Sequence, residues 1–306
     1  INDWIRIIKE TDDHECKDEN EMLYKLRRGI GISMRLASGS EDLHNLINLL
    51  KINKHIDTRK ITLNSDVISS SDLKHKGYLD RAINIVIKAG IPKIEAYQMA
   101  TINTAESLKI NSFYGSIAPG KCADLLFIDD LEEVNIKSVI VNGKLILQNK
   151  KFKKQYKNID FPRNFYDTVK INQNFNIEKL KILNNNKEAK VRVIVVDGES
   201  YITHEKISIL PVVNGVIQSS ISDDIMYITA IDRVKGTSKL ANGFIKGFEF
   251  VNGAIAMTKN SHAQSLLVAG TNHDDMFIAV KALEEIGGGN IVVSEGKIIK
   301  SLPLEY

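Results

Sequence analysis

Two short stretches of the chain carry side chains that can bind metal ions or move protons, one after an apolar segment and one after a predicted strand. His14 lies between Asp13 and Glu15, shortly after an apolar segment. A neutral imidazole is a common metal ligand, and an adjacent carboxylate can orient its ring. Asp66 follows a predicted strand at 61–63, where a carboxylate can bind a metal and accept a proton from water. Both stretches therefore predict metal-assisted proton chemistry.

Each stretch also has a purely structural interpretation. Residues 13–15 can form a surface turn that caps the following helix, and Asp66, with serines at 69–71, can belong to an ordinary turn. A third polar stretch, residues 259–262 with His262, lies between two apolar segments and is typical of a loop, with or without a site. From the residues alone, both interpretations stay open at each stretch.

The composition is that of a soluble globular protein. The 306 residues are 43% hydrophobic and 26% charged, and this length allows two or three domains. The net charge of +3 is too small to indicate nucleic acid or a membrane, and no apolar run is long enough to span a bilayer. Cys16 and Cys122 lie far apart without metal spacing. We therefore expect a cytoplasmic protein without nucleic-acid or membrane partners.

Residues 1–107 alternate short apolar strands with amphipathic helices, a pattern typical of an α/β barrel or sheet. The predicted strands lie at 30–34 and 61–63, and the predicted helices at 19–28, 43–50, 79–89 and 93–99. In an α/β barrel, side chains at the carboxyl ends of the strands point into the active site. The position of Asp66 after a strand therefore fits a barrel site.

Residues 108–150 predict antiparallel β-structure. Asn142 and Gly143 join two apolar runs, 139–141 and 144–147. An Asn-Gly pair between apolar runs is the strongest short hairpin signal. We therefore expect a small β-domain after the first 107 residues.

The rest of the chain predicts a linker and then a second domain. Residues 151–190 are polar and rich in Asn and Lys, which is typical of a linker. Residues 191–306 predict further α/β structure, with strands at 191–196 and 225–231 and an amphipathic helix at 273–285. The carboxylates at the start of this helix favour helix formation there.

Together these motifs resemble the adenine deaminases of the amidohydrolase superfamily, from about residue 10 to the C-terminus. The string at 119–124, Pro-Gly-Lys-Cys-Ala-Asp, is shared widely within that superfamily, and residues 13–15 are similar to its Asp-His-Glu segment. Residues 65–66 fall where the family has Thr-Asp-Asp. The glycine-bearing segments at 243–248 and 287–289 follow the C-terminal domain peculiar to adenine deaminases.

The resemblance implies a role for each candidate site residue. It implies that His14 and Asp66 bind the metal, that Asp66 also moves a proton, and that Glu15 is catalytic as an orienting carboxylate. It further implies substrate-binding roles for Arg35, Ser65 and His262. For Arg35, structural pairing is the other option.

The implied reaction is hydrolytic deamination of adenine to hypoxanthine and ammonia by a metal-activated hydroxide, in purine salvage. The implied cofactor is manganese or iron in a binuclear site, and a homo-oligomer is compatible with the sequence. The implied fold class is α/β: the C-terminal part of a metal-dependent (β/α)8 barrel, a small β-domain and an additional α/β domain. The early barrel strands and their ligands are absent before Ile1, so we expect an N-terminally incomplete chain.

Several residues depart from the family pattern. Val67 replaces the second Asp of Thr-Asp-Asp, Tyr78 replaces a histidine, and both histidines of the family's His-Asp-Ser-His-Asn segment are displaced at 261–265. These changes favour an alternative, a degenerate and non-catalytic paralogue that binds purine or acts as a scaffold. An amidohydrolase for another cyclic amide or amidine is a further alternative, but it would not need the C-terminal domain.

Overall fold

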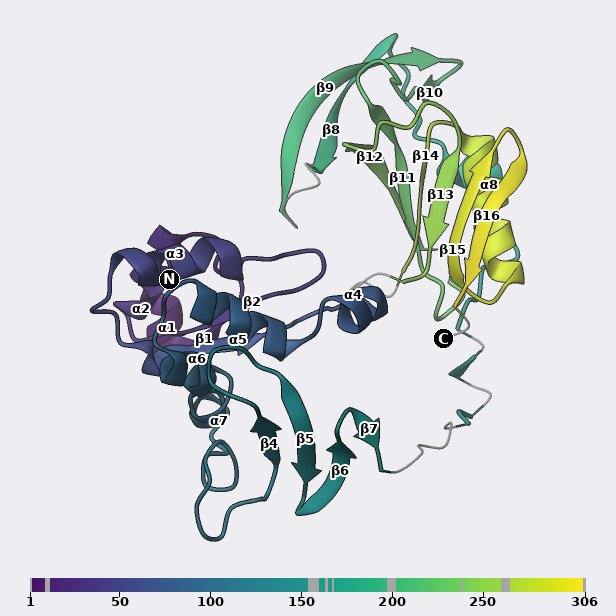
Figure 1. Cartoon of the computed structure of the whole chain (residues 1–306). Coiled ribbons are helices and arrows are strands. Elements are labelled where there is room, and N and C mark those ends of the chain that lie inside the picture. The colour runs from purple at the N-terminus through teal and green to yellow at the C-terminus, as the bar shows by residue number, and fades with distance from the viewer. Residues whose placement is uncertain are drawn as a thin grey trace. The chain divides into compact units, whose positions relative to one another are not determined.

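The chain folds into two units, Ile1–Lys157 and Asn158–Tyr306, in a computed structural model (Figure 1). Each unit is described by itself. The structure describes residues 2–8, 12–153, 160–162, 165–166, 168–196, 202–237, 239–259 and 265–304. Within these ranges, no helix combines the length and the apolar character that crossing a membrane would require.

The first unit opens with short parallel strands separated by helices. The sheet order is β1-β2-β3, and Asp13, Ile32 and Ile61 are direct neighbours across it. The elements are α1 (Asn2–Ile8), β1 (Asp12–Asp13), α2 (Glu19–Leu26), β2 (Gly31–Arg35), α3 (Leu43–Ile52), a 3-10 turn (Thr58–Lys60), β3 (Ile61–Asn64), α4 (Ser70–His75), α5 (Leu79–Lys88), α6 (Lys93–Met99) and α7 (Ile102–Ser107). Because the strands are parallel, their carboxyl ends lie at one edge of the sheet.

The helices of this unit bury one apolar face against the sheet. In α2, Asp18 caps the first turn by accepting hydrogen bonds from the backbone N–H groups of residues 20 and 21, and Met22 is fully buried. In α3, leucines at helical spacing, such as Leu43 and Leu46, join the same core as Ile32 of β2. This core holds the three strands in register.

A separate antiparallel sheet ends the first unit. Its strands are β4 (Leu125–Ile128), β5 (Ile136–Val141), β6 (Lys144–Gln148) and β7 (Lys151–Phe152), in that order. Asn142 and Gly143 join β5 to β6 with φ angles of 48° and 73°, the left-handed pair of a tight hairpin turn. The hairpin expected from the sequence is confirmed.

The second unit is built on one nine-stranded sheet. Its order is β10-β9-β8-β12-β11-β14-β13-β15-β16, and every neighbouring pair is antiparallel except β8 with β12. The elements are a 3-10 turn (Ile177–Leu180), β8 (Glu188–Val196), β9 (Thr203–Val213), β10 (Val216–Ile217), β11 (Ile225–Ile231), β12 (Leu240–Lys246), β13 (Ala254–Met257), β14 (Leu266–Gly270), α8 (His273–Glu285), β15 (Gly289–Ser294) and β16 (Lys297–Pro303).

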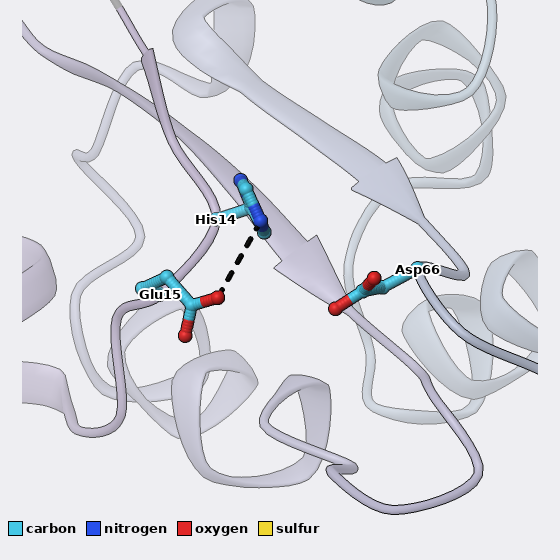
Figure 2. A group of neighbouring side chains, drawn as sticks. All are labelled: His14, Glu15 and Asp66. Atoms are coloured by element: carbon cyan, nitrogen blue, oxygen red, sulfur yellow. Dashed lines mark ion pairs between the residues drawn. The ribbon is translucent and has the colours of Figure 1, made fainter. Parts of the chain in front are cut away.

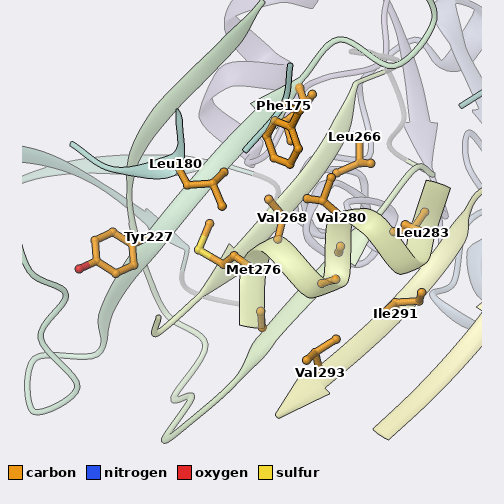
Figure 3. Close-up of a cluster of buried hydrophobic side chains, with 14 of the residues drawn as sticks. Phe175, Leu180, Tyr227, Leu266, Val268, Met276, Val280, Leu283, Ile291 and Val293 are labelled. Carbon is orange, nitrogen blue, oxygen red and sulfur yellow. The ribbon is translucent and has the colours of Figure 1, made fainter. Parts of the chain in front are cut away.

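Helix α8 supplies much of the core of this unit. Met276, Val280 and Leu283 of α8 are fully buried in one cluster with Val268 and Ile291 of the sheet, as Figure 3 shows. The helix expected from the apolar spacing at 273–285 is confirmed, with the same bounds.

The residues expected to form a linker contribute to this core as well. Val169, Phe175 and Leu180 are buried in the cluster that α8 joins. Their apolar side chains are isolated between Asn, Lys and Glu residues, so neither helical nor strand periodicity is visible there. The second unit therefore includes residues well before the expected start at 191, whereas the α/β class of the chain is confirmed.

Candidate metal centre

The predicted site residues come together because β1 and β3 flank β2 in a parallel sheet. His14 and Glu15 directly follow β1, and Ser65 and Asp66 directly follow β3. Figure 2 shows the side chain of Asp66 extending toward His14 and Glu15 across the end of β2. Two segments that lie far apart in the sequence thus bring these three residues together at one edge of the sheet, as active-site residues do in α/β barrels.

The donor atoms of these three side chains are close enough to share one ion. His14, Glu15 and Asp66 each offer a ligand atom within 4.8 Å of the others. His14 Nε2 lies 3.5 Å from Glu15 Oε1, and both side chains are about half exposed. The site is therefore open to solvent on the side of His14 and Glu15.

Arg35, the last residue of β2, ties the carboxylates of the site together. Its side chain is only 4% exposed, and its Nη1 donates hydrogen bonds to Glu15 Oε1 at 3.0 Å and to Asp66 Oδ2 at 2.8 Å. Its Nε and Nη2 donate to Asp42 Oδ2 at 3.0 and 2.7 Å. Burial opposes the charged guanidinium, but the hydrogen bonds to Asp42 and Asp66 outweigh it and raise the pKa of Arg35 above its usual value. These contacts favour structural pairing for Arg35, and its role in substrate binding stays a prediction.

Asp42 and Ser40 are members of the site that the sequence did not reveal. Ser40 Oγ donates to Asp42 Oδ2 at 2.8 Å and accepts a hydrogen bond from Arg35. Asp42 directly precedes α3, a position that indicates a helix cap, yet its side chain makes no capping hydrogen bond. In the sequence, the position of Asp42 before a helix thus indicated a capping role and not its contact with Arg35.

The backbone at Asp66 adopts an uncommon conformation. Its φ angle is 45°, in the left-handed region that residues other than glycine seldom occupy. Asp and Asn tolerate this region better than most residues, and the ion pair with Arg35 helps to hold the turn. The turn directs the carboxylate of Asp66 back toward β2 and His14.

Beside the three donors lies a small hollow of about 350 Å³. It is lined by Asp12, His14, Ser33, Leu63, Asn64, Ser65, Asp66, Tyr78 and Leu79. Ser65 is buried in its wall, whereas Tyr78 is 45% exposed at its rim. The predicted substrate residue Ser65 thus borders this hollow, but His262 lies outside the described residues.

Comparison with known proteins shows which families the chain resembles. Residues 8–146 match the amidohydrolase family, and residues 200–306 match the adenine deaminase C-terminal domain. The chain is 37% identical over 294 residues to an adenine deaminase of Staphylothermus marinus, covering 95% of this chain and 48% of that protein. It is 36% identical over 293 residues to one of Thermosipho africanus and 34% identical over 292 residues to one of Clostridium botulinum strain Langeland, with 95% of this chain and 49% of each relative covered. The resemblance to adenine deaminases is confirmed.

These relatives are longer than the chain, which spans about half the length of the curated relatives it matches. Among solved structures, a β-aspartyl dipeptidase of Fervidobacterium islandicum matches with a TM-score of 0.36 and 23% identity, over 48% of this chain and 40% of that one. At this level of structural overlap the likeness carries no argument about the site.

The amidohydrolase family implies a divalent metal ion, and the donors of this chain fit one. An imidazole nitrogen and carboxylate oxygens are common ligands of divalent first-row metals. His14, Glu15 and Asp66 present this donor set at the carboxyl ends of two strands. The buried guanidinium of Arg35 fixes the two carboxylates before any ion binds.

Proposed function

We propose that the protein deaminates adenine hydrolytically to hypoxanthine and ammonia. The observation that supports this most directly is the convergence of His14, Glu15 and Asp66 at one sheet edge, in a chain whose other unit matches the adenine deaminase C-terminal domain. Attack of water on the purine carbon that bears the amino group, followed by departure of ammonia, requires a strong nucleophile and a proton carrier.

In this proposal His14 and Asp66 would hold a divalent cation, manganese or iron, as part of a binuclear centre. The bound cation supplies an activated water at neutral pH. Asp66 takes a proton from the attacking water and delivers it to the departing amino group. Glu15, 3.5 Å from His14 Nε2, orients the imidazole ring.

We further propose that adenine occupies the hollow beside the donors. Ser65 lies in its wall and can offer a hydroxyl group to the purine ring, whereas a substrate-binding role for His262 stays a prediction from the resemblance. Tyr78 at the rim offers an aromatic surface for a planar base. Arg35 reaches substrate only through the carboxylates that it holds. A purine substrate in turn places the activity in purine salvage, in the cytoplasm.

The decisive test is an assay on full-length protein loaded with manganese. Loss of adenine absorbance together with release of ammonia is expected, and Asp66→Asn should reduce the rate by about 10²- to 10⁴-fold because the proton carrier is removed. Asp129→Asn is the matched control, because Asp129 contacts Lys137 and Asn135 beside the separate antiparallel sheet, away from the donors of the site. Folded protein that binds manganese but leaves adenine unchanged would instead identify the non-catalytic paralogue.

A further inference from the structure

A buried lysine lies behind the segment that carries His14 and Glu15. Lys25 belongs to α2, and its side chain is only 8% exposed. Its Nζ lies 2.6 Å from Asp13 Oδ2 and 2.7 Å from Glu21 Oε1. Lysine is almost never buried unless it is paired, so this pair of contacts gives the side chain a specific structural task.

The two carboxylates connect Lys25 to the backbone around His14. The second oxygen of Asp13, Oδ1, accepts a hydrogen bond of 2.6 Å from the backbone N–H of Glu15. The second oxygen of Glu21, Oε2, accepts one of 3.2 Å from the backbone N–H of Lys17. Each carboxylate therefore contacts Lys25 with one oxygen and the backbone of residues 15–17 with the other. We call Lys25, Asp13 and Glu21 the Lys25 clamp.

Among the described residues, the clamp affects His14 through the backbone beside it. The His14 side chain is 54% exposed, and its Nε2 lies 3.5 Å from Glu15 Oε1. The position of its imidazole therefore depends on the backbone on either side, at Asp13 and Glu15. A metal site requires its ligands within about 0.5 Å of the productive geometry, so loss of this support should weaken binding.

We propose that Lys25 is a positioning residue for the His14–Glu15 side of the metal centre. It contacts neither ion nor substrate and acts through Asp13 and the backbone of Glu15. The proposal rests on the proposed function, since it assumes that His14 is a ligand. It adds a residue that the reaction itself does not use.

The first test compares Lys25→Met with Met22→Ala in the full chain. Met22 lies on the same helix and is fully buried, so its truncation weakens α2 without removing the clamp. Lys25→Met is expected to weaken manganese binding, measured by titration calorimetry, about 10- to 100-fold, as loss of supporting contacts does at other metal sites. Met22→Ala is expected to lower the melting temperature but to leave manganese affinity within about twofold. Equal affinities in both variants would overturn the proposal.

A second comparison tests the route through Asp13. Asp13→Asn keeps the amide oxygen that accepts from Glu15 but removes the charge that pairs with Lys25. If the two residues act together, the double variant with Lys25→Met binds manganese no more weakly than the weaker single variant. Fully additive losses would show that Lys25 acts elsewhere. Lys25→Arg, which keeps charge and donors, should restore most of the affinity and guards against a methionine variant that fails to fold.

Hydrogen exchange separates this inference from the proposed function. Without metal, the amide of Glu15 should exchange at least about tenfold faster in Lys25→Met than in Met22→Ala, because only the first loses the clamp. If wild-type protein binds no manganese, the proposed metal centre fails, yet the exchange rate of Glu15 still decides whether Lys25 fixes this segment. An unchanged rate would overturn the positioning role even in an active enzyme.

Discussion

The two units of the chain bury different kinds of side chain. In the first unit, Arg35, Lys25 and Asp42 are buried beside strands that also carry apolar residues. In the second unit, the cluster around α8 is apolar, and the buried carboxylate of Asp275 accepts hydrogen bonds from Asn272 Nδ2 and from the backbone N–H of Gly296. Among the described residues, the buried charges of the first unit surround an open sheet edge, whereas the buried Arg233 of the second unit donates to Thr168.

This difference indicates where the chemistry lies in the described part of the chain. Buried charges cost free energy unless they are paired, so a protein retains them where they fix geometry or function. In the first unit the paired charges surround His14, Glu15 and Asp66. The described part of the second unit contains the larger of the apolar cores and, by this contrast, is expected to matter for stability more than for metal binding. The following predictions test this contrast.

The largest effect is expected for Arg35→Met. Removing the guanidinium leaves Asp42 and Asp66 without their shared partner, which should lower the free energy of unfolding of the first unit by about 3–5 kcal/mol. Hydrogen exchange read by mass spectrometry can follow peptides of each unit separately. The matched control is Arg81→Met, because Arg81 is partly exposed and pairs with one carboxylate, Glu41, among the described residues, and it should cost less than about 1 kcal/mol. Equal losses in the two variants would contradict a special role for Arg35.

The corresponding change in the second unit is Leu283→Ala. Leu283 lies on the buried face of α8 and is fully buried. Its truncation should lower the free energy of unfolding by about 2–5 kcal/mol through lost burial and a cavity. Manganese affinity at the first unit should remain unchanged, measured by the same titration. Lys281→Ala on the same helix provides the control, because the Lys281 side chain is 38% exposed. A loss of manganese binding in Leu283→Ala would break the division of roles between the units.

The sequence reveals most of the strongly periodic elements. Helix 273–285, the hairpin at Asn142 and Gly143, and the strands 61–63 and 225–231 follow from local patterns that the structure confirms. Their signals lie within a few residues of one another. The core residues near Phe175 were missed because each is isolated among polar residues and is buried only by contacts with distant segments.

The residue types of the candidate site were predictable, but the hydrogen bonds and ion pairs between them were not. The family resemblance implied that His14 and Asp66 bind the same metal centre, and the structure brings their donors together. That Arg35 would join three carboxylates, or that Lys25 would be buried, could not be read from a single sequence. Such contacts depend on the register of β1, β2 and β3, which sequence spacing does not give.

A smaller effect is expected at the helix caps. Asn272 Oδ1 accepts a hydrogen bond of 2.8 Å from the N–H of Asp275, so Asn272→Ala should destabilise the second unit by about 1 kcal/mol. Ser69 caps the six-residue helix α4, which buries no residue in the first unit. Ser69→Ala should therefore change only local exchange within α4. Urea unfolding measures the global stability of Ser69→Ala. A global loss of stability in this variant would show that the contrast between the units is wrong.

The smallest effect is a dependence of the second unit on pH. Burial, aided by the charge of Lys181, lowers the pKa of His273 below its ordinary value. Below about pH 6.5 the unfolded chain therefore binds a proton that the folded unit does not, and stability should fall as the pH falls from there. Urea unfolding at about pH 7 and about pH 5 measures this slope.

Two variants check the assignment of that slope. His273→Phe keeps an aromatic ring against Tyr227, whose centroid lies 4.1 Å away, and should remove part of the pH dependence. His204→Phe, at an exposed position of β9, should leave it unchanged. A slope that is the same in all three proteins would show that carboxylates elsewhere cause it.

The sharing of Arg35 among Glu15, Asp42 and Asp66 also constrains how this site can evolve. Because one cation serves three acidic positions, the effect of replacing any one of them depends on which residues occupy the other two. Mutational paths that exchange these positions singly pass through forms with unbalanced buried charge. Lineages that alter the site are therefore expected to change these positions together, and a library that varies them jointly should recover more folded variants than one that varies them one at a time.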